Sequence, residues 1–218
     1  MSKIIAIDGP AGSGKGTLAK ELAKKYNLIN IDTGATYRCV ALKVLKENIN
    51  IDDKERIIEI SSNIKIELKQ EGRVFLDDIE VTKEIRSKEV SNIVSIISSI
   101  PEVRRNMVNI QRKLAENKNI VMEGRDITTV VFPDAKYKFY LDASIESRAQ
   151  RRYKELREKG NMQVTYDEVL SDMKFRDAND SSRAFAPLKQ AEDAYYLDSS
   201  DMTIDEVVNE MKKDIIVK

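Results

Sequence analysis

The stretch "KIIAIDGPAGSGKGTLAKELAKKY", Lys3–Tyr26, joins a short apolar run to an amphipathic run through a glycine-rich turn. The apolar residues of Ile4–Asp8 are bounded by glycine and proline, which is typical of a buried strand. Leu18, Leu22 and Ala23 recur at helical spacing, and lysines follow where a helix would end. The stretch therefore predicts a strand and a helix joined by a turn whose glycines allow unusual dihedrals or close approach to another group.

The turn itself has the composition of a phosphate-binding loop. It fits G-x-x-x-x-G-K-[ST] with one glycine inserted before the threonine, and it stands between a predicted strand and a predicted helix. Its consecutive backbone N–H groups would form a concave anion site backed by the positive end of the helix. We expect Lys15 to reach the β- and γ-phosphates of ATP and the Thr17 hydroxyl to face Mg²⁺. The predicted ATP-binding residues are Gly9, Pro10, Ala11, Gly12, Ser13, Gly14, Lys15, Gly16 and Thr17.

Composition excludes several other chemistries. The 218 residues contain no histidine, which removes imidazole acid–base catalysis and histidine metal ligation. Lys plus Arg equals Asp plus Glu at 37 each, so no net charge points to nucleic acid or to an acidic membrane. The single cysteine, Cys39, rules out an internal disulfide. We expect no signal peptide or membrane anchor and a location in the cytoplasm.

Strand and helix patterns alternate along most of the chain. Strands are expected at 28–32, 119–123, 138–142 and 193–200, and helices at 33–48, from 87 to a break at Pro101, and at 102–117. This alternation predicts an α/β fold, a three-layer α/β/α core with a mostly parallel sheet. Period-two runs within Ile64–Val81 predict a small antiparallel β insert, and the charged, arginine-rich stretch 144–186 predicts helices. Thr203 and Glu206 predict a capping box that opens the terminal helix.

A kinase also needs a site for the acceptor, and three groups of residues are candidates for it. Thr33 follows the second strand as a predicted helix cap, with Arg38 more than one turn later. Arg125 and Asp126 follow the strand 119–123, at the sheet edge where open α/β proteins bind ligands. Ser95 and Arg104 lie on either side of the break at Pro101 and could converge on the same pocket. Each group alone is also compatible with an ordinary cap, loop or surface position.

The helical stretch 144–186 carries arginines at spaced positions. Arg148, Arg151 and Arg152 crowd one predicted helix, whereas Arg176, Asp180 and Arg183 lie at i, i+4 and i+7 of the next and should share a face. Such pairs could be a solvated surface in which each pair contributes only ~0.3–0.5 kcal/mol. Planar arginine forks also match the charge of a transferring phosphoryl group, which spreads over three oxygens. We interpret the stretch as a phosphate-closing lid.

Taken together, these motifs resemble those of the bacterial cytidylate kinases, a family of P-loop nucleoside monophosphate kinases. The resemblance spans nearly the whole chain and rests on "IDGPAGSGKGTLAKELA", "IDTGATYR", "EVSNIVSIISSIPEVRRNMVNIQRKLA", "MEGRDITTVVFPDAKYKFYLDAS", "RAQRRYKEL" and "RDANDSSRAFAPL". It implies transfer of the ATP γ-phosphoryl group to CMP or dCMP with Mg²⁺. It also implies one P-loop kinase domain over 1–218, with core 1–62, 87–147 and 187–218, a monophosphate-binding insert 63–86 and a lid 148–186.

The resemblance also assigns residues. It implies that the acceptor phosphate is held by Thr33, Arg38 and Arg125, with Arg183 reaching it from the lid. The cytosine would be read by Ser95, Arg104 and Asp126, and the ribose would contact Arg176 and Asp180. Charge neutralisation during transfer would fall to Lys15, Arg125, Arg183 and Arg152. Glu123 matches the acidic family position before Gly-Arg-Asp, where it either approaches Mg²⁺ through water or simply ends the strand.

Two other interpretations of the sequence remain open. The first is a P-loop kinase for another small acceptor, such as UMP, AMP or a hydroxy acid. The second is a nucleotide-dependent switch without phosphoryl transfer, for which an arginine lid has no obvious use. For the favoured kinase we expect a monomer whose partners are ATP and CMP or dCMP, without nucleic acid or membrane.

Overall fold

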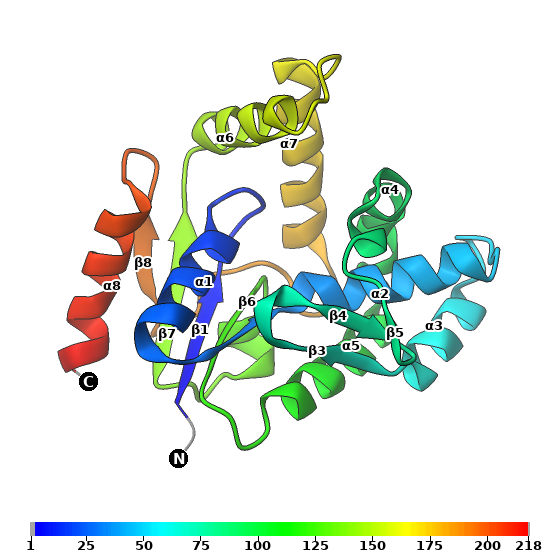
Figure 1. Cartoon of the computed structure of the whole chain (residues 1–218), viewed down its shortest axis with the longest axis horizontal. Coiled ribbons are helices and arrows are strands. Elements are labelled where there is room, and N and C mark those ends of the chain that lie inside the picture. Colours follow the sequence, from blue (N-terminus) through cyan, green and yellow to red (C-terminus); the bar gives the residue numbers. More distant parts are fainter. Residues whose placement is uncertain (1–2, 218) are drawn as a thin grey trace.

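The computed structural model describes residues 3–217, and its centre is a five-stranded sheet (Figure 1). The strand order is β2-β6-β1-β7-β8, and every neighbouring pair is parallel. The strands are β1 (Ile4–Asp8), β2 (Ile29–Asp32), β6 (Ile120–Gly124), β7 (Tyr137–Asp142) and β8 (Tyr195–Asp198). All five carboxyl ends therefore meet at one edge of the sheet, as the sequence predicted for its ligand-binding side.

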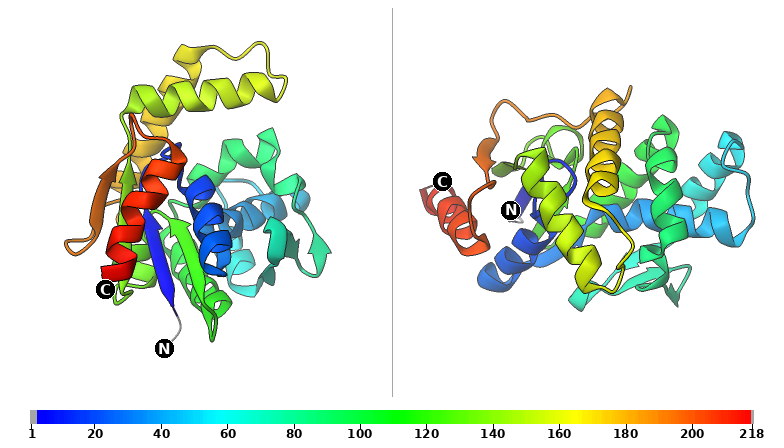
Figure 2. Two further views of the ribbon diagram at one scale, coloured as in Figure 1. Left: turned by 60° about the vertical axis from the view of Figure 1, so that its left-hand side comes forward. Right: turned by 90° about the horizontal axis from the view of Figure 1, so that it is seen from above.

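Alternate side chains of β1 supply the two faces of the core. Ile5 and Ile7 pack with helices α1 (Lys15–Tyr26) and α8 (Ile204–Val217), whereas Ala6 packs on the opposite side with α5 (Pro101–Ala115). Successive residues of a strand point to opposite faces, so a strand covered on both sides reads as a continuous apolar run. The predicted three-layer arrangement is confirmed, and Figure 2 shows the helices on both sides of the sheet.

A second hydrophobic cluster lies beside the sheet. It joins α2 (Thr33–Lys46), α3 (Lys54–Asn63) and α4 (Lys88–Ile97) to a small sheet with the order β3-β4-β5. The pairs of that sheet are antiparallel, as predicted, and its strands are β3 (Ile66–Leu68), β4 (Val74–Leu76) and β5 (Ile79–Glu80). Short 3₁₀ turns occupy Gln70–Gly72 and Glu84–Arg86. Helix α3 was not predicted, although the Asp53 side chain caps it by accepting from the Arg56 N–H.

The arginine-rich stretch forms two helices, α6 (Ile145–Glu158) and α7 (Tyr166–Ser182). They pack on each other through a small cluster that includes Ala149, Val169 and Met173, and Figure 1 shows them beyond the carboxyl edge of the sheet. Thr165 forms a capping box with Glu168 at the start of α7. The predicted helices are confirmed, with an interruption at 159–165.

Other predictions about elements have mixed outcomes. The helix break at Pro101 and the Thr203–Glu206 capping box are both confirmed. The β-branched run Ile127–Val131, which the sequence left without assignment, forms a π-helical turn after β6. Among residues 3–217, no helix has the length and apolar character needed to cross a membrane.

Candidate functional site

A cavity of about 770 Å³ opens at the carboxyl edge of the main sheet. Its walls come from the glycine-rich loop, α2, α4, α5, the turn after β6, both α6 and α7, and the segment after β8. The structure brings together all of the predicted site residues except Gly9 and Pro10, which are not among the residues that line this cavity. Motifs from both ends and the middle of the chain therefore share one cleft.

The glycine-rich loop is shaped by close contacts to its neighbours. Gly9 has φ +150°, and a Cβ atom there would lie 1.9 Å from the backbone oxygen of Leu141. Lys15 opens α1 and is 4% exposed, and its Nζ donates to Pro10 O at 2.7 Å and to Ser13 Oγ at 3.2 Å. The Lys15 ammonium group is therefore hydrogen-bonded to the glycine-rich loop at the wall of the cavity. Phosphate oxygens bound there could replace these two acceptors.

The buried carboxyl group of Glu123 lies close to the start of α1, where Lys15 is located. A Cβ on Gly16 would lie 3.3 Å from Glu123 Oε1, so the carboxylate at the end of β6 adjoins the first turn of α1. Burial lowers the pKa of Lys15 and raises the pKa of Glu123, and each charge partly offsets this effect on the other. A carboxyl group and an amine, both buried, therefore lie beside the glycine-rich loop.

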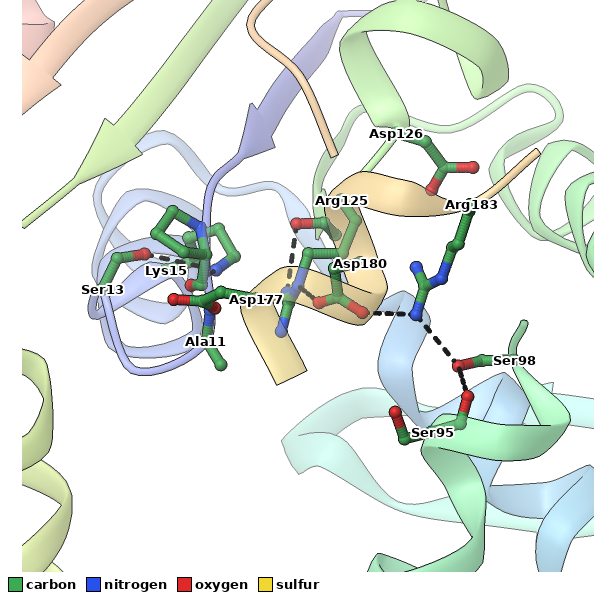
Figure 3. A network of polar contacts seen from close by, with 12 residues as sticks. Ala11, Ser13, Lys15, Ser95, Ser98, Arg125, Asp126, Asp177, Asp180 and Arg183 are labelled. Atoms are coloured by element: carbon green, nitrogen blue, oxygen red, sulfur yellow. Dashed lines mark hydrogen bonds and ion pairs between the residues drawn. The ribbon is translucent and has the colours of Figure 1, made fainter. Parts of the chain in front are cut away.

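Helices α6 and α7 are tied directly to the glycine-rich loop. Arg148 Nη1 donates to Ala11 O at 2.9 Å and to Asp177 Oδ2 at 2.6 Å. Asp177 Oδ1 accepts from the Ala11 N–H at 3.4 Å (Figure 3). One ion pair thus connects both helices to the loop, a role that the sequence did not predict for either residue.

Thr33 does not cap α2 as predicted. The cap position is Asp32, which makes no side-chain cap bond, and Thr33 is the first helical residue. The Thr33 hydroxyl instead donates to Glu123 O at 2.8 Å, so it ties the start of α2 to the end of β6. Arg38, further along α2, is fixed toward α4 because its Nη1 donates to Ile85 O and to Ser91 Oγ. Both residues still line the cavity.

A chain of polar contacts crosses the cavity from β6 to α4. Arg125 Nε donates to Asp180 Oδ2 at 2.8 Å, and the other oxygen of Asp180 accepts from Arg183 Nη2. Arg183 Nη2 also donates to Ser98 Oγ at 3.1 Å (Figure 3). Arg183 follows the end of α7 rather than sharing its helical face, because the helix stops at Ser182. The predicted guanidinium groups therefore converge, although α7 ends four residues before the predicted helical limit at 186.

Arg104 and Asp126 form the most deeply buried charged pair of the cavity. Arg104 Nη2 lies 2.7 Å from Asp126 Oδ2, and the guanidinium stacks over the Tyr37 ring at 5.1 Å. Several buried polar atoms of cavity-lining residues have no hydrogen-bond partner within 3–217, namely Tyr37 Oη, Ser95 Oγ, Arg104 Nε and Arg183 Nε. Buried polar atoms without partners are costly, so this end of the cavity is suited to a polar ligand.

The remaining predicted residues are less constrained. Arg152 is 40% exposed and pairs with Glu155 on the same helix at 2.7 Å. Arg176 and Thr17 also line the cavity, and Thr17 is exposed. Of the described residues of the insert 63–86, only Arg86 lines this cavity. The cleft is therefore bordered by α2 and α4 rather than by the strands of the insert.

Sequence reasoning missed several residues of the cleft. Tyr37 lies one turn after Thr33, a spacing that could have revealed it. The segment after β8 could have been inferred from the rule that ligands bind at the carboxyl ends of parallel strands. Arg151, noted among the crowded arginines but given no function, donates to Ser199 O. The missed residues of that region are Arg151, Ser199, Met202, Thr203, Ile204 and Val207.

Comparisons with known proteins agree with this geometry. The family model described as cytidylate kinase matches residues 5–216. A cytidylate kinase of Caldanaerobacter subterraneus subsp. tengcongensis is 55% identical over 204 residues, which cover 94% of this chain and 90% of the relative. One from Fusobacterium nucleatum subsp. nucleatum is 50% identical over 212 residues, with 97% and 96% covered.

A solved structure supports the fold independently of close sequence similarity. Shikimate kinase from Bacteroides thetaiotaomicron superposes with a TM-score of 0.50 at 14% identity and covers 98% of each chain. This likeness concerns architecture alone, whereas the family match rests on sequence over almost the full length. The chain belongs to the cytidylate kinase family.

Proposed function

We propose that the protein is a cytoplasmic, monomeric cytidylate kinase that transfers the γ-phosphoryl group of ATP to CMP or dCMP. The products are ADP and CDP or dCDP. The observation that carries this proposal is the pairing of two polar halves in one cavity: the glycine-rich loop with Lys15 at one end, and Arg125, Arg183, Arg104 and Asp126 at the other. Such an arrangement suits two phosphorylated ligands placed in line.

The acceptor phosphate would be held by Thr33, Arg38 and Arg125, with Arg183 reaching it from the lid. The cytosine would reach the Arg104–Asp126 pair and Ser95, and the ribose would face Arg176 and Asp180. Cytosine presents an amino donor at C4 and acceptors at N3 and O2, which match a carboxylate and a guanidinium. Uracil presents the reverse pattern at the first two positions, which leaves buried groups unpaired at about 1–3 kcal/mol each. CMP is therefore preferred to UMP.

The residues around the glycine-rich loop are compatible with a Mg²⁺ ion that is bound mainly by the phosphates of the substrate. No group of three or more His, Cys, Asp or Glu residues suitable for a metal occurs within the described part of the chain. The Thr17 hydroxyl and the carboxylates of Asp32 and Glu123 all line the cavity, and oxygen is the ligand that Mg²⁺ prefers. We propose that these groups hold the ion directly or through water. When bound, it supplies positive charge to the transferring phosphate oxygens.

Transfer would need positioning and electrostatic stabilisation rather than a covalent intermediate. Lys15 would release Pro10 O and Ser13 Oγ and donate to the phosphates of ATP. Arg125 and Arg183 would neutralise charge on the phosphoryl group as it moves. We propose that 148–186 acts as a lid whose movement brings Arg152 toward the nucleotide and excludes water, with 63–86 as the insert of a single domain.

An acceptor screen tests the proposal. ADP release from ATP is measured with CMP, dCMP, UMP, AMP or no acceptor, all at the same magnesium concentration. Strong stimulation by CMP or dCMP and weak stimulation by UMP and AMP is the expected result. Equal release with and without acceptor would favour a nucleotide-dependent switch, and preference for UMP or AMP would identify a kinase of another acceptor.

A further inference from the structure

Ser98 connects two parts of the cleft that come from distant regions of the chain. It ends α4 as its C-cap residue, is 7% exposed and lines the cavity. Its backbone oxygen accepts from Arg104 Nη1 at 3.2 Å, and its side-chain oxygen accepts from Arg183 Nη2 at 3.1 Å (Figure 3). One residue thus binds a guanidinium from α5 through its main chain and another from the segment after α7 through its side chain.

The orientation of the Ser98 hydroxyl is fixed by its own helix. Its proton is donated to Ser95 O at 3.1 Å, so a lone pair is left to face Arg183. Ser99, the next residue, makes the same kind of bond to Ile96 O at 2.7 Å but is exposed and lies outside the cavity lining. The chain therefore contains two adjacent hydroxyls of similar local geometry, only one of which meets the lid arginine.

The Ser98 hydroxyl is a second acceptor, beside Asp180, for the buried guanidinium of Arg183. Burial lowers the pKa of its guanidinium, and the charges of Arg104 and Arg125 act in the same direction, whereas Asp180 opposes them. Ser98 and Asp180 both engage Nη2, and the buried Nε has no hydrogen-bond partner among the described residues. The hydrogen bonds to Ser98 and Asp180 therefore hold the guanidinium at one nitrogen, Nη2.

We propose that Ser98 is a positioning residue that couples recognition of the acceptor base to placement of the lid arginine. Its main chain is attached to the base-reading Arg104, and its hydroxyl holds Arg183 where the acceptor phosphate is expected. When the acceptor nucleotide binds Arg104, it also fixes Ser98 at the end of α4, because Arg104 donates to the Ser98 backbone oxygen. The Ser98 hydroxyl then holds Arg183 in position. This inference rests on the proposed function and adds to it a residue that does not itself touch the substrate.

The test compares Ser98→Ala with Ser99→Ala as the matched control. KM for CMP, KM for ATP and kcat are measured, together with the Kd of CMP by calorimetry. For S98A we expect KM and Kd for CMP to rise about tenfold, the size expected for a lost hydrogen bond to a charged group, with KM for ATP within about twofold. S99A should match the wild type, and S98T, which keeps the hydroxyl, should restore most of the CMP affinity.

A double-mutant cycle assigns the effect to Arg183. In an Arg183→Ala background, S98A should change the Kd of CMP by less than about twofold, because its partner is already absent. An undiminished penalty in that background would show that Ser98 acts through α4 or Arg104, and S98A kinetics equal to those of S99A would remove the coupling altogether. If the wild type neither binds nor phosphorylates CMP, the proposed function fails first, and this inference fails with it.

Discussion

Arg104 Nη2 and Asp126 Oδ2 lie 2.7 Å apart in the cleft, and their side chains are only 2% and 3% exposed. Two charges removed from water in this way depend on each other, since the loss of one leaves the other buried without compensation. The pair ties α5 to the turn after β6, and we propose that it also presents polar atoms to the acceptor base. A single alanine substitution would not distinguish these two functions.

Replacement of Asp126 by asparagine separates these functions. Asp126→Ala should lower the free energy of unfolding by about 3–5 kcal/mol, because Arg104 loses its partner. Asp126→Asn keeps the shape but can present a donor where the carboxylate offered only acceptors. We expect the ratio of kcat/KM for CMP to that for UMP to fall at least tenfold, since an amide can donate to the uracil oxygen. ATP affinity should change little, and an unaltered ratio would refute the base-reading assignment.

Lys15 provides a test of the nucleotide end of the cleft. Lys15→Met should lower kcat by about 10²–10³-fold, the range observed when one group that stabilises a transition state is removed. Its stability should remain close to that of the wild type, because burial lowers the pKa of Lys15 and raises the pKa of Glu123 to about 7, so the carboxyl group left behind can hold a proton. Steady-state kinetics and thermal unfolding together check this. A variant that unfolds easily, or that keeps full kcat, would contradict the assignment.

Features that depend on residues close together in the sequence were predicted correctly, whereas features that depend on distant residues were not. The strand, loop and helix of Ile4–Tyr26 could be predicted because apolar period, glycine spacing and lysine position all lie within one short stretch. Thr33 lies in the cleft as predicted, but the prediction that it caps α2 was wrong, since its hydroxyl donates to Glu123 O, a partner 90 residues away. Arg183 was likewise placed correctly, although the helix before it ends one residue earlier.

The turn Ile127–Val131 shows why structure that depends on distant contacts could not be predicted from the sequence. A run of β-branched residues favours a strand by local propensity. The Asp8 carboxylate instead accepts from the backbone N–H groups of Ile127 and Thr128, at 2.8 and 2.7 Å, and this binds the turn to the end of β1. Such a contact across 119 residues has no signature in a single sequence, and it fixes the segment that carries Arg125 and Asp126.

Gly9 tests the close packing of the phosphate-binding loop. A Cβ at this position would lie 1.9 Å from Leu141 O, so Gly9→Ala forces β1 and β7 apart or displaces the loop. We expect it to lower the free energy of unfolding by at least about 2 kcal/mol and to weaken ATP binding. Gly160→Ala is the control, because Gly160 also has positive φ but a Cβ added there would meet no heavy atom within 4 Å. Its cost should be about 1 kcal/mol without an effect on ATP, as denaturant unfolding and calorimetry can determine.

Asp8 makes the stability of the protein dependent on pH. Its carboxylate is fully buried and accepts from Ile127 N, Thr128 N and Thr128 Oγ1. Burial raises its pKa to about 6, whereas the hydrogen bonds from Thr128 and Ile127 act in the opposite direction. In an unfolded chain the pKa of an aspartate is about 3.9. Between about pH 4 and pH 6 the folded protein therefore retains a proton that the unfolded chain has lost.

The stabilisation that this proton provides is present below about pH 4 and is lost as the pH rises through 6. Asp8→Asn cannot titrate and should lack this component. The free energy of unfolding of the wild type, measured relative to that of D8N by denaturant titration, should thus fall by about 2 kcal/mol between pH 4.5 and pH 7. Parallel pH profiles for the two proteins would mean that Asp8 stays ionised throughout, with its three donors outweighing the effect of burial. A wild type that gains stability relative to D8N as the pH rises would reverse the sign and show that those donors lower the pKa below its unfolded value.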